Sequence, residues 1–272
     1  MRRKIAGFAR VDILATIVAL SVIAFCAVPA CGMRQRATRS MLCLANMRQL
    51  TTAWNQYAAE HDGKLVQNFD GAAAIGGQGL PPGAAPWAIG WVDWTTAPNN
   101  TNYTLLSGFS RLTPYLPANS NIFRCPSDNY ASPAQQKRGW SGRVRSYSMN
   151  GTVGAITDSG PFDPIYHLAR KISDLVIPGP TETFVFLEEH PDSINDPVFF
   201  PPSRSWIDLP AAFHQGACSF GFGDGHAELH HWLGSARRLP VRFNFLPPNT
   251  PPNDPDIHFV SYHSSRVSTR SY

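Results

Sequence analysis

Apolar and polar positions divide the chain into an apolar run near its start and a longer, mixed part after it. The run extends from Val11 to Ala30 and contains one charged residue, Asp12, at its edge. Roughly 20 apolar residues are needed for a helix to cross about 30 Å of hydrocarbon, so the run predicts a transmembrane helix. Pro29, near its end, is typical of a helix kink.

After Gly32 the pattern becomes that of an amphipathic helix. Apolar side chains recur at steps of four and three and share one face; they are Cys43, Met47, Leu50, Trp54 and Tyr57. Gly63 favours a helix end. Joined to the apolar run, this segment predicts one helix of about 50 residues, near 75 Å long at 1.5 Å per residue. We expect its second half to pack on its own domain and its first half to be buried in lipid or in neighbouring subunits.

Later segments predict short strands separated by loops rich in Gly, Pro and Asn. We expect strands from Ile122 to a stop at Pro126, over 143–150 and over 183–189. A hairpin is predicted over 217–232. Together with the long helix, these elements indicate an α+β fold in which a mostly antiparallel sheet packs on the second half of the helix.

The hairpin prediction rests on Asp224-Gly225, a pair that permits the positive φ angles of a two-residue type I′ turn. Such a turn would pair Phe222 with Ala227 and Phe220 with Leu229, and these four would share an apolar face. The opposite face would carry Gly221, Gly223, His226, Glu228 and His230.

Charge and composition exclude one class of partner. The formal net charge is +4, but three of these charges are Arg2, Arg3 and Lys4, so a chain without them carries +1. This balance argues against a basic nucleic-acid-binding surface. The low share of charged residues and the frequent Pro and Gly are typical of a loop-rich domain.

Of the five cysteines, Cys26 and Cys31 lie in or directly after the apolar run, and the other three lie farther along the chain. We expect Cys43 and Cys125 to be candidates for a disulfide, with Cys218 as a small buried residue. The alternative is that all three are free buried thiols.

The start of the chain resembles the leader of type IV pilins and type II secretion pseudopilins. Three basic residues precede Gly7-Phe8, and Asp12 follows four residues after that Phe. In that family a prepilin peptidase cuts after the glycine and methylates the new amino terminus, which pairs with an acid. The resemblance implies cleavage and N-methylation at Gly7 and Phe8 and an assembly role for Asp12. The family usually has Glu there and an apolar residue in place of Arg10.

Two other kinds of segment share the charged start and the apolar core. One is an ordinary signal anchor, and the other is a secretory signal peptide cut near the small residues Ala27, Ala30 and Gly32.

Motifs farther along are similar to pilin-like proteins abundant in planctomycetes and verrucomicrobia. His214, nine residues and then Asp224-Gly225 match the H-X9-DG signature of that family. Shorter stretches that agree in the same order lie at 43–50, 125–128, 146–151 and 188–196. The resemblance covers nearly the whole chain, and the order of the motifs carries it more than any one of them.

This resemblance implies a non-enzymatic structural subunit of a type II secretion pseudopilus or a type IV pilus-like envelope assembly. It implies a leader peptide over 1–7, a transmembrane helix over 8–31, its exported continuation over 32–63 and a pilin-like ectodomain over 64–272. The protein would cross the inner membrane once, with a cytoplasmic N-terminus and a C-terminal domain in the periplasm or in a filament. Its partners would be the membrane, the prepilin peptidase and other pilin-like subunits, contacted through their membrane helices.

Two groups of polar residues are candidates for a metal ion. The loop residues Asp192, Asn195 and Asp196 offer the oxygen ligands that calcium prefers. His214, Asp224 and His226 offer ligands for a transition metal. The alternative is that Asp224 makes the turn, His214 hydrogen-bonds the hairpin and the other polar groups are solvated. We therefore expect no cofactor other than a candidate calcium ion.

Two further functions stay open as alternatives. An exported metal-dependent hydrolase would rest on His214, Asp224 and His226. A carbohydrate- or surface-binding module would use Trp87, Trp91 and Trp94, although large aromatic residues more often fill a core or an interface.

Overall fold

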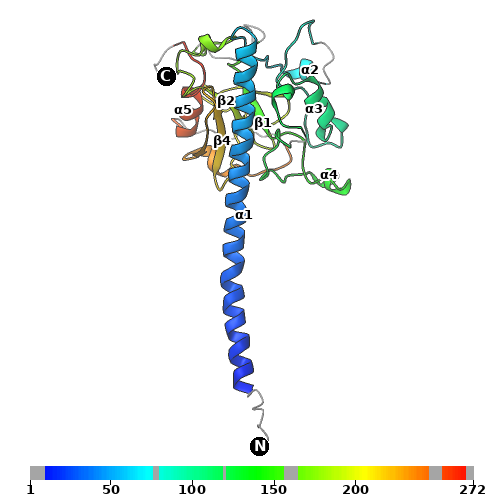
Figure 1. Cartoon of the computed structure of the whole chain (residues 1–272), viewed down its shortest axis with the longest axis vertical. Coiled ribbons are helices and arrows are strands. Elements are labelled where there is room, and N and C mark those ends of the chain that lie inside the picture. The colour runs from blue at the N-terminus through cyan, green and yellow to red at the C-terminus, as the bar shows by residue number, and fades with distance from the viewer. Residues whose placement is uncertain (1–9, 76–79, 119–120, 156–164, 245–252, 268–272) are drawn as a thin grey trace, which may run out of the picture. The chain divides into compact units, whose positions relative to one another are not determined.

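The computed structural model describes residues 10–75, 80–118, 121–155, 165–244 and 253–267. Within them, the side chains of 10–13, 22–33, 72–73, 105 and 238 also lie outside the description. The chain forms two units, 1–39 and 40–272. Helix α1 (Arg10–Glu60) is continuous through both units (Figure 1).

The transmembrane prediction is corrected by this structure. Among the described residues, no helix is both long and apolar enough to cross a membrane. The transmembrane helix expected over 8–31 and the single-pass inner-membrane location are therefore wrong. The α+β class stands, with a five-stranded sheet.

The sheet lies in the second unit and has the order β3-β1-β2-β4-β5. Its strands are β1 (Tyr147–Asn150), β2 (Phe184–Glu188), β3 (Val198–Phe199), β4 (Ala217–Phe222) and β5 (Ala227–His231). All neighbours pair antiparallel except β1 and β3, which are parallel. Every residue of β1, β2 and β4 is buried, because both faces of the sheet are covered.

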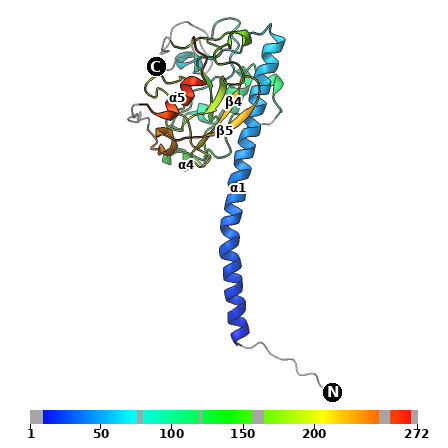
Figure 2. The same cartoon turned by 90° about the vertical axis from the view of Figure 1, so that its left-hand side faces the viewer.

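One face of the sheet packs against the second part of α1, Ser40–Glu60 (Figure 2). The predicted stripe of apolar side chains on this helix is confirmed, since its members from Cys43 to Tyr57 are all buried in one core. Thr51 also donates a hydrogen bond to the Gly225 carbonyl, 3.2 Å away, in the hairpin turn. Gly63, at φ 74°, follows the end of the helix and donates to the Ala58 carbonyl.

The other face packs against α5 (Pro255–Tyr262) in a second, aromatic core. Phe220 on β4 lies edge-on to Phe259 of α5, with ring centroids 5.4 Å apart. Asp254 caps the N-terminus of α5 by accepting from the Asp256 amide.

Short helices complete the described chain. They are α2 (Gly71–Ala74), α3 (Tyr103–Phe109), α4 (Pro133–Lys137) and the 3-10 turns Pro98–Asn100, Thr113–Tyr115, Ile172–Asp174 and Ser235–Arg238. The strand expected from Ile122 is wrong, because 122–128 form turns, but Phe123 and Cys125 are still buried in the core.

The hairpin exists, but its predicted register is wrong by one residue. Phe220 pairs with Glu228 and Gly221 with Ala227, so the loop has three residues, Gly223 to Gly225, instead of two. Gly225 at φ 97° supplies the left-handed residue that a three-residue loop requires. The slip places the phenylalanines of β4 on the same face as His226 and His230, opposite to the prediction.

Gly221 allows the close approach of α1 to the sheet. A Cβ atom at this position would lie 2.5 Å from Thr51 Cγ2 and 2.8 Å from Met47 Cγ. We predict that Gly221→Val destabilises the full-length protein by about 1–3 kcal/mol, because the added side chain overpacks the helix-sheet core. Urea unfolding followed by circular dichroism measures this change.

The matched control is Gly108→Ala in α3, where an added Cβ meets nothing within 4 Å. This change is expected to leave stability the same or raise it by up to about 1 kcal/mol. Equal unfolding midpoints for both variants would contradict the packing argument.

Candidate metal centre

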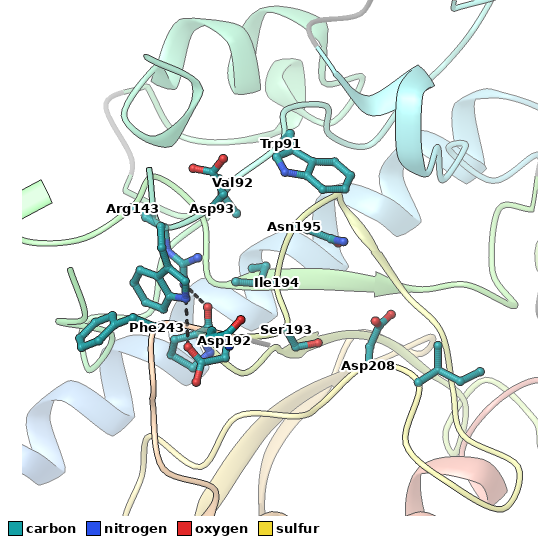
Figure 3. Close-up of a pocket in the computed structure, with 14 residues that line it drawn as sticks. Trp91, Val92, Asp93, Arg143, Asp192, Ser193, Ile194, Asn195, Asp208 and Phe243 are labelled. Atoms are coloured by element: carbon teal, nitrogen blue, oxygen red, sulfur yellow. Dashed lines mark hydrogen bonds between the residues drawn. The ribbon is translucent and has the colours of Figure 1, made fainter. Parts of the chain in front are cut away.

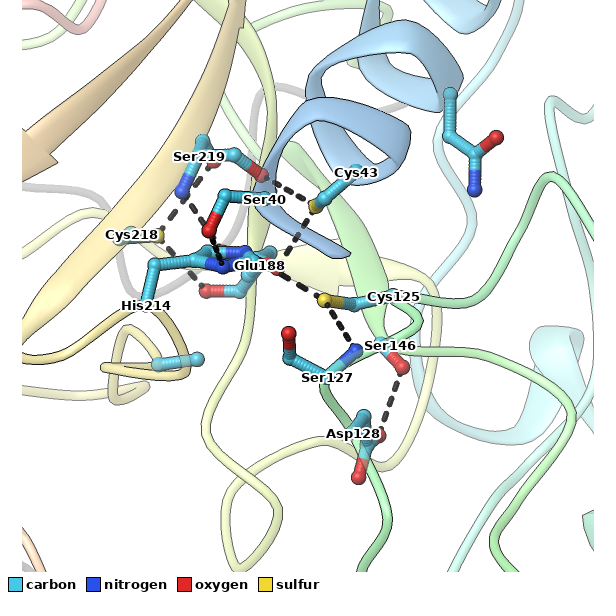
Figure 4. A network of polar contacts seen from close by, with 12 residues as sticks. Ser40, Cys43, Cys125, Ser127, Asp128, Ser146, Glu188, His214, Cys218 and Ser219 are labelled. Carbon is cyan, nitrogen blue, oxygen red and sulfur yellow. Dashed lines mark hydrogen bonds and ion pairs between the residues drawn. The ribbon is translucent and has the colours of Figure 1, made fainter. Parts of the chain in front are cut away.

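Four buried residues with metal-ligating side chains meet where α1 contacts the sheet (Figure 4). They are Cys43 on α1, Cys125 in the loop after α3, Glu188 at the end of β2 and His214 in the turn before β4. None is more than 5% exposed. Their ligand atoms all lie within 4.8 Å of one another, so this group could hold a metal ion.

Local structure places each of the four side chains. Cys43 begins the buried stripe of α1, and Glu188 pairs across the sheet with Tyr147 of β1. Cys125 opens a turn in which its carbonyl accepts from the Asp128 amide, 3.0 Å away. His214 sits in a tight turn whose next residue, Gln215, has a φ of 60°.

Glu188 is the centre of the contacts among these four residues. Its Oε1 accepts from the Cys43 thiol at 3.0 Å and lies 3.0 Å from His214 Nε2. The same His214 nitrogen lies 3.5 Å from Cys125 Sγ. One carboxylate oxygen, one imidazole nitrogen and two sulfurs therefore point toward a common space.

A second layer of hydrogen bonds holds these four groups. Ser219 donates its amide to Glu188 Oε2 at 2.8 Å, and the Ser127 amide donates to Cys125 Sγ at 3.2 Å. Ser40 Oγ lies 3.0 Å from His214 Nδ1, which leaves Nε2 turned to the centre. Two hydroxyls, of Tyr147 and Ser219, each lie 3.2 Å from Cys43 Sγ.

Burial and mutual contact shift the pKa values of these groups. Burial disfavours the charged imidazole of His214, but hydrogen bonds and charges from Cys43 and Glu188 outweigh it and raise its pKa to about 10. Burial also opposes the ionised form of Glu188, yet the His214 hydrogen bond and charge leave its pKa below the usual value. Burial raises the pKa of the Cys125 thiol. The carboxylate and imidazolium thus form a buried ion pair beside the sulfur atoms of Cys43 and Cys125.

This geometry differs from that of a cysteine-based nucleophilic site. In such a site the base faces the nucleophile with one ring nitrogen and its orienting acid with the other. Here Nε2 of His214 faces both Cys125 and Glu188, while Nδ1 faces Ser40. Cys125 is also fully buried. The four side chains are therefore not arranged as a nucleophile, base and orienting acid.

The structure separates the two parts of the H-X9-DG motif. His214 belongs to the buried centre, whereas Asp224 and Gly225 form the hairpin turn. Asp224 Oδ1 lies 2.6 Å from His226 Nδ1, and these two side chains are 33% and 42% exposed. His226 also stacks on Phe222. The predicted grouping of His214, Asp224 and His226 around one ion is not formed.

The acidic loop expected to bind calcium uses its oxygens for hydrogen bonds within the protein. Asp192 accepts from Trp94 Nε1 at 2.9 Å and from the Arg242 amide at 2.6 Å. Asp196 accepts from the amides of Gly71 and Val198, and Asn195 Oδ1 accepts from the Asp196 amide.

The candidate disulfide between Cys43 and Cys125 is not formed, although both cysteines belong to the four-residue group. Cys43, Cys125 and Cys218 are all free buried thiols in the structure. Cys218 is buried as expected. Glu188 was not singled out as a ligand by the sequence analysis. Its only signal was a charged residue at the end of an otherwise apolar strand.

The three tryptophans do not form one binding face. Trp87 is fully buried in the core, where it contacts Phe186. Trp91 and Trp94 line a cavity with Arg143 and Phe243 (Figure 3). The Arg143 guanidinium lies 3.9 Å from the centroid of the Trp94 ring, so one face of that ring is already covered.

The predicted processing residues Gly7 and Phe8 lie outside the described residues. Asp12 is within α1, but its side chain is also outside the description.

No protein-family model, curated protein or solved structure matches the chain. The pilin-like family therefore stays a prediction that rests on the resemblance of the motifs.

The buried Glu188–His214 pair and the exposed Asp224–His226 pair differ in what they contribute to stability. We predict that Glu188→Ala lowers the unfolding free energy of the full chain by about 3–5 kcal/mol, because it leaves His214 buried without its carboxylate partner. Asp224→Asn, in the exposed pair, is the control and should cost less than about 1 kcal/mol. Chemical denaturation of the three proteins measures both changes, and similar losses for the two variants would contradict the assignment.

His230 predicts a pH dependence of stability. It stacks on Phe259 of α5 with ring centroids 3.4 Å apart, and burial lowers its pKa from 6.5 to about 4. The unfolded chain then binds more protons, so this group lowers stability as the pH falls from about 6.5 toward about 4.

His230→Phe keeps the stacking and removes the titration, so we expect a smaller loss of stability over that pH range than in the wild type. His231→Gln, at the exposed neighbouring position, is the control and should behave as the wild type. Urea unfolding midpoints measured at both ends of this pH range test the prediction. An equal change of midpoint with pH in His230→Phe and in the wild type would refute it.

Proposed function

We propose that this chain is a non-catalytic structural subunit of a pseudopilus or pilus-like assembly. It would act by packing beside copies or relatives of itself through the first part of α1. The observation that carries the proposal is the contrast between the two parts of this single helix.

The second part of α1 is a core element of its own domain. Met47, Leu50 and Trp54 are fully buried there, and Gly221 lets the helix approach the sheet. In the first unit, by contrast, the described apolar side chains are exposed. Ile17 is 54% and Val18 is 61% exposed, and Leu14 and Leu20 are similar. Contiguous apolar surface on one helix favours a partner that covers it.

The polar centre supports a structural role over an enzymatic one. Its nucleophilic and acid-base groups are buried, and its histidine lacks the arrangement of a catalytic base. Asp224 and His226, on which a hydrolase would rest, form a separate exposed pair. The prepilin peptidase remains part of the proposal as the processing partner, on the strength of the motif at Gly7-Phe8.

Calcium in the loop 192–196 is not part of this proposal. The carboxylate oxygens of Asp192 and Asp196 already accept N–H hydrogen bonds, which an ion would have to replace.

Photocrosslinking in the cells that make the protein tests the assembly role. A benzoylphenylalanine at Ile17 or Val18 of the full chain should give adducts with a second copy or with another pilin-like chain, because these side chains would lie in the subunit contact. Mass spectrometry of the adducts identifies the partner.

The matched control carries the same probe at Val176, an apolar residue of the second unit that is 70% exposed. It should give few adducts or none. The absence of adducts from both helix positions, or equal yields from position 176, would contradict the proposal.

A further inference from the structure

We propose that Cys43, Cys125, Glu188 and His214 bind one zinc ion, which joins α1 to the sheet. The four ligands come from four segments far apart in the sequence, and an ion among them would link the helix, the loop after α3, strand β2 and the turn before β4 (Figure 4). This inference is independent of the assembly role.

The distances suit a tetrahedral ion. Zinc bonds of about 2.3 Å to sulfur and about 2.0 Å to nitrogen or oxygen place ligand atoms about 3.3 to 3.8 Å apart at tetrahedral angles. Glu188 Oε1 lies 3.0 Å from both Cys43 Sγ and His214 Nε2, and Cys125 Sγ lies 3.5 Å from His214 Nε2. All remaining separations are below 4.8 Å. Movements of less than about 1 Å would complete the site, which is within the reach of side-chain adjustment.

The donor set selects the ion by its chemistry. Two thiolates are poor ligands for calcium or magnesium, which prefer oxygen, and good ligands for zinc. One imidazole and one carboxylate complete four ligands, the number found in closed structural zinc sites. The low exposure of all four residues fits a site that stabilises a fold.

The second layer of hydrogen bonds is of the kind that orients metal ligands. His214 is held through Nδ1 by Ser40, so Nε2 faces the other three ligand atoms. The Ser127 amide donates to Cys125 Sγ, and the Ser219 amide donates to the second oxygen of Glu188. Each donor would stabilise the negative charge of a bound ligand.

The protons and charges of this site balance on binding. The ion would bind Cys43 and Cys125 as thiolates and His214 as a neutral imidazole, so the protons that these groups carry leave the site on binding. Two thiolates and the Glu188 carboxylate then surround a divalent cation, which leaves one net negative charge. The amide donors of Ser127 and Ser219 face that charge.

A cleft lies beside the centre. It is lined by Asn46, Arg124 and Asn129, among others, and it borders Cys125. Cys125 is fully buried, so an ion that enters from this cleft would need a local opening at this residue.

Metal analysis of the full-length protein, purified without chelators under reducing conditions, tests the proposal. Elemental analysis should find one zinc per chain. X-ray absorption at the zinc edge should show two sulfur neighbours at about 2.3 Å and two nitrogen or oxygen neighbours at about 2.0 Å. This measurement needs no variant, so it stays informative if substitutions prevent folding.

Variants then locate the ion. Cys43→Ser and His214→Gln should each lower zinc content and weaken the sulfur-to-metal charge-transfer absorption of the cobalt-substituted protein. Cys218→Ala is the matched control, because this third cysteine is also fully buried but lies outside the four-ligand group. It should retain both the zinc and the cobalt spectrum.

Several results would overturn the proposal. One is protein that neither contains zinc nor takes it up after reduction, and another is iron or copper in place of zinc. A native Cys43–Cys125 disulfide would also overturn it. So would zinc that persists at full occupancy in a Cys43→Ser/Cys125→Ser double variant. The last result would place the ion elsewhere in the chain.

Discussion

The contact between the second part of α1 and the sheet is the constraint on which the rest of the domain depends. A helix can approach this sheet only where β4 has no side chain, and Gly221 provides that place beneath Met47 and Thr51. The same contact buries polar groups, and a buried carboxylate or imidazole is costly unless it is paired. Glu188 and His214 meet this requirement through one another. Helix packing and polar pairing therefore occur at the same contact between α1 and the sheet, which we call the seam.

That seam also explains the division of the sheet into two cores. The face toward α1 carries the buried polar centre together with the helix stripe, while the face toward α5 is aromatic. Cys43 and Ser219 contact each other at the seam, and Phe220, one residue along β4, points the other way to Phe259. Because successive side chains of a strand point to opposite faces, Ser219 contacts the polar centre and Phe220 contacts the aromatic core.

The sequence predicted what periodicity and local turn chemistry determine. The stripe from Cys43 to Tyr57 and strand β2 were found because one repeats every three to four residues and the other is a short apolar run. The hairpin register was missed, since Asp224-Gly225 suits both two- and three-residue loops, and in the structure Gly225 is the left-handed last residue of a three-residue loop. The apolar run before Gly32 has the composition of a transmembrane helix, but the described part of α1 does not support one. The role of Glu188 depends on tertiary contacts with Cys43, which lies 145 positions before it, and with His214, which lies 26 positions after it. No local sequence pattern indicates such contacts.

Hydrogen exchange of the full-length protein tests most directly whether α1 and the sheet form one cooperative unit. If the seam holds them together, amides of Ser40–Glu60 should exchange as slowly as those of β2 and β4, because they open only with the whole domain. Exchange over 40–60 that is much faster than in β2 and β4 would show that the helix leaves the sheet independently, and would contradict the account.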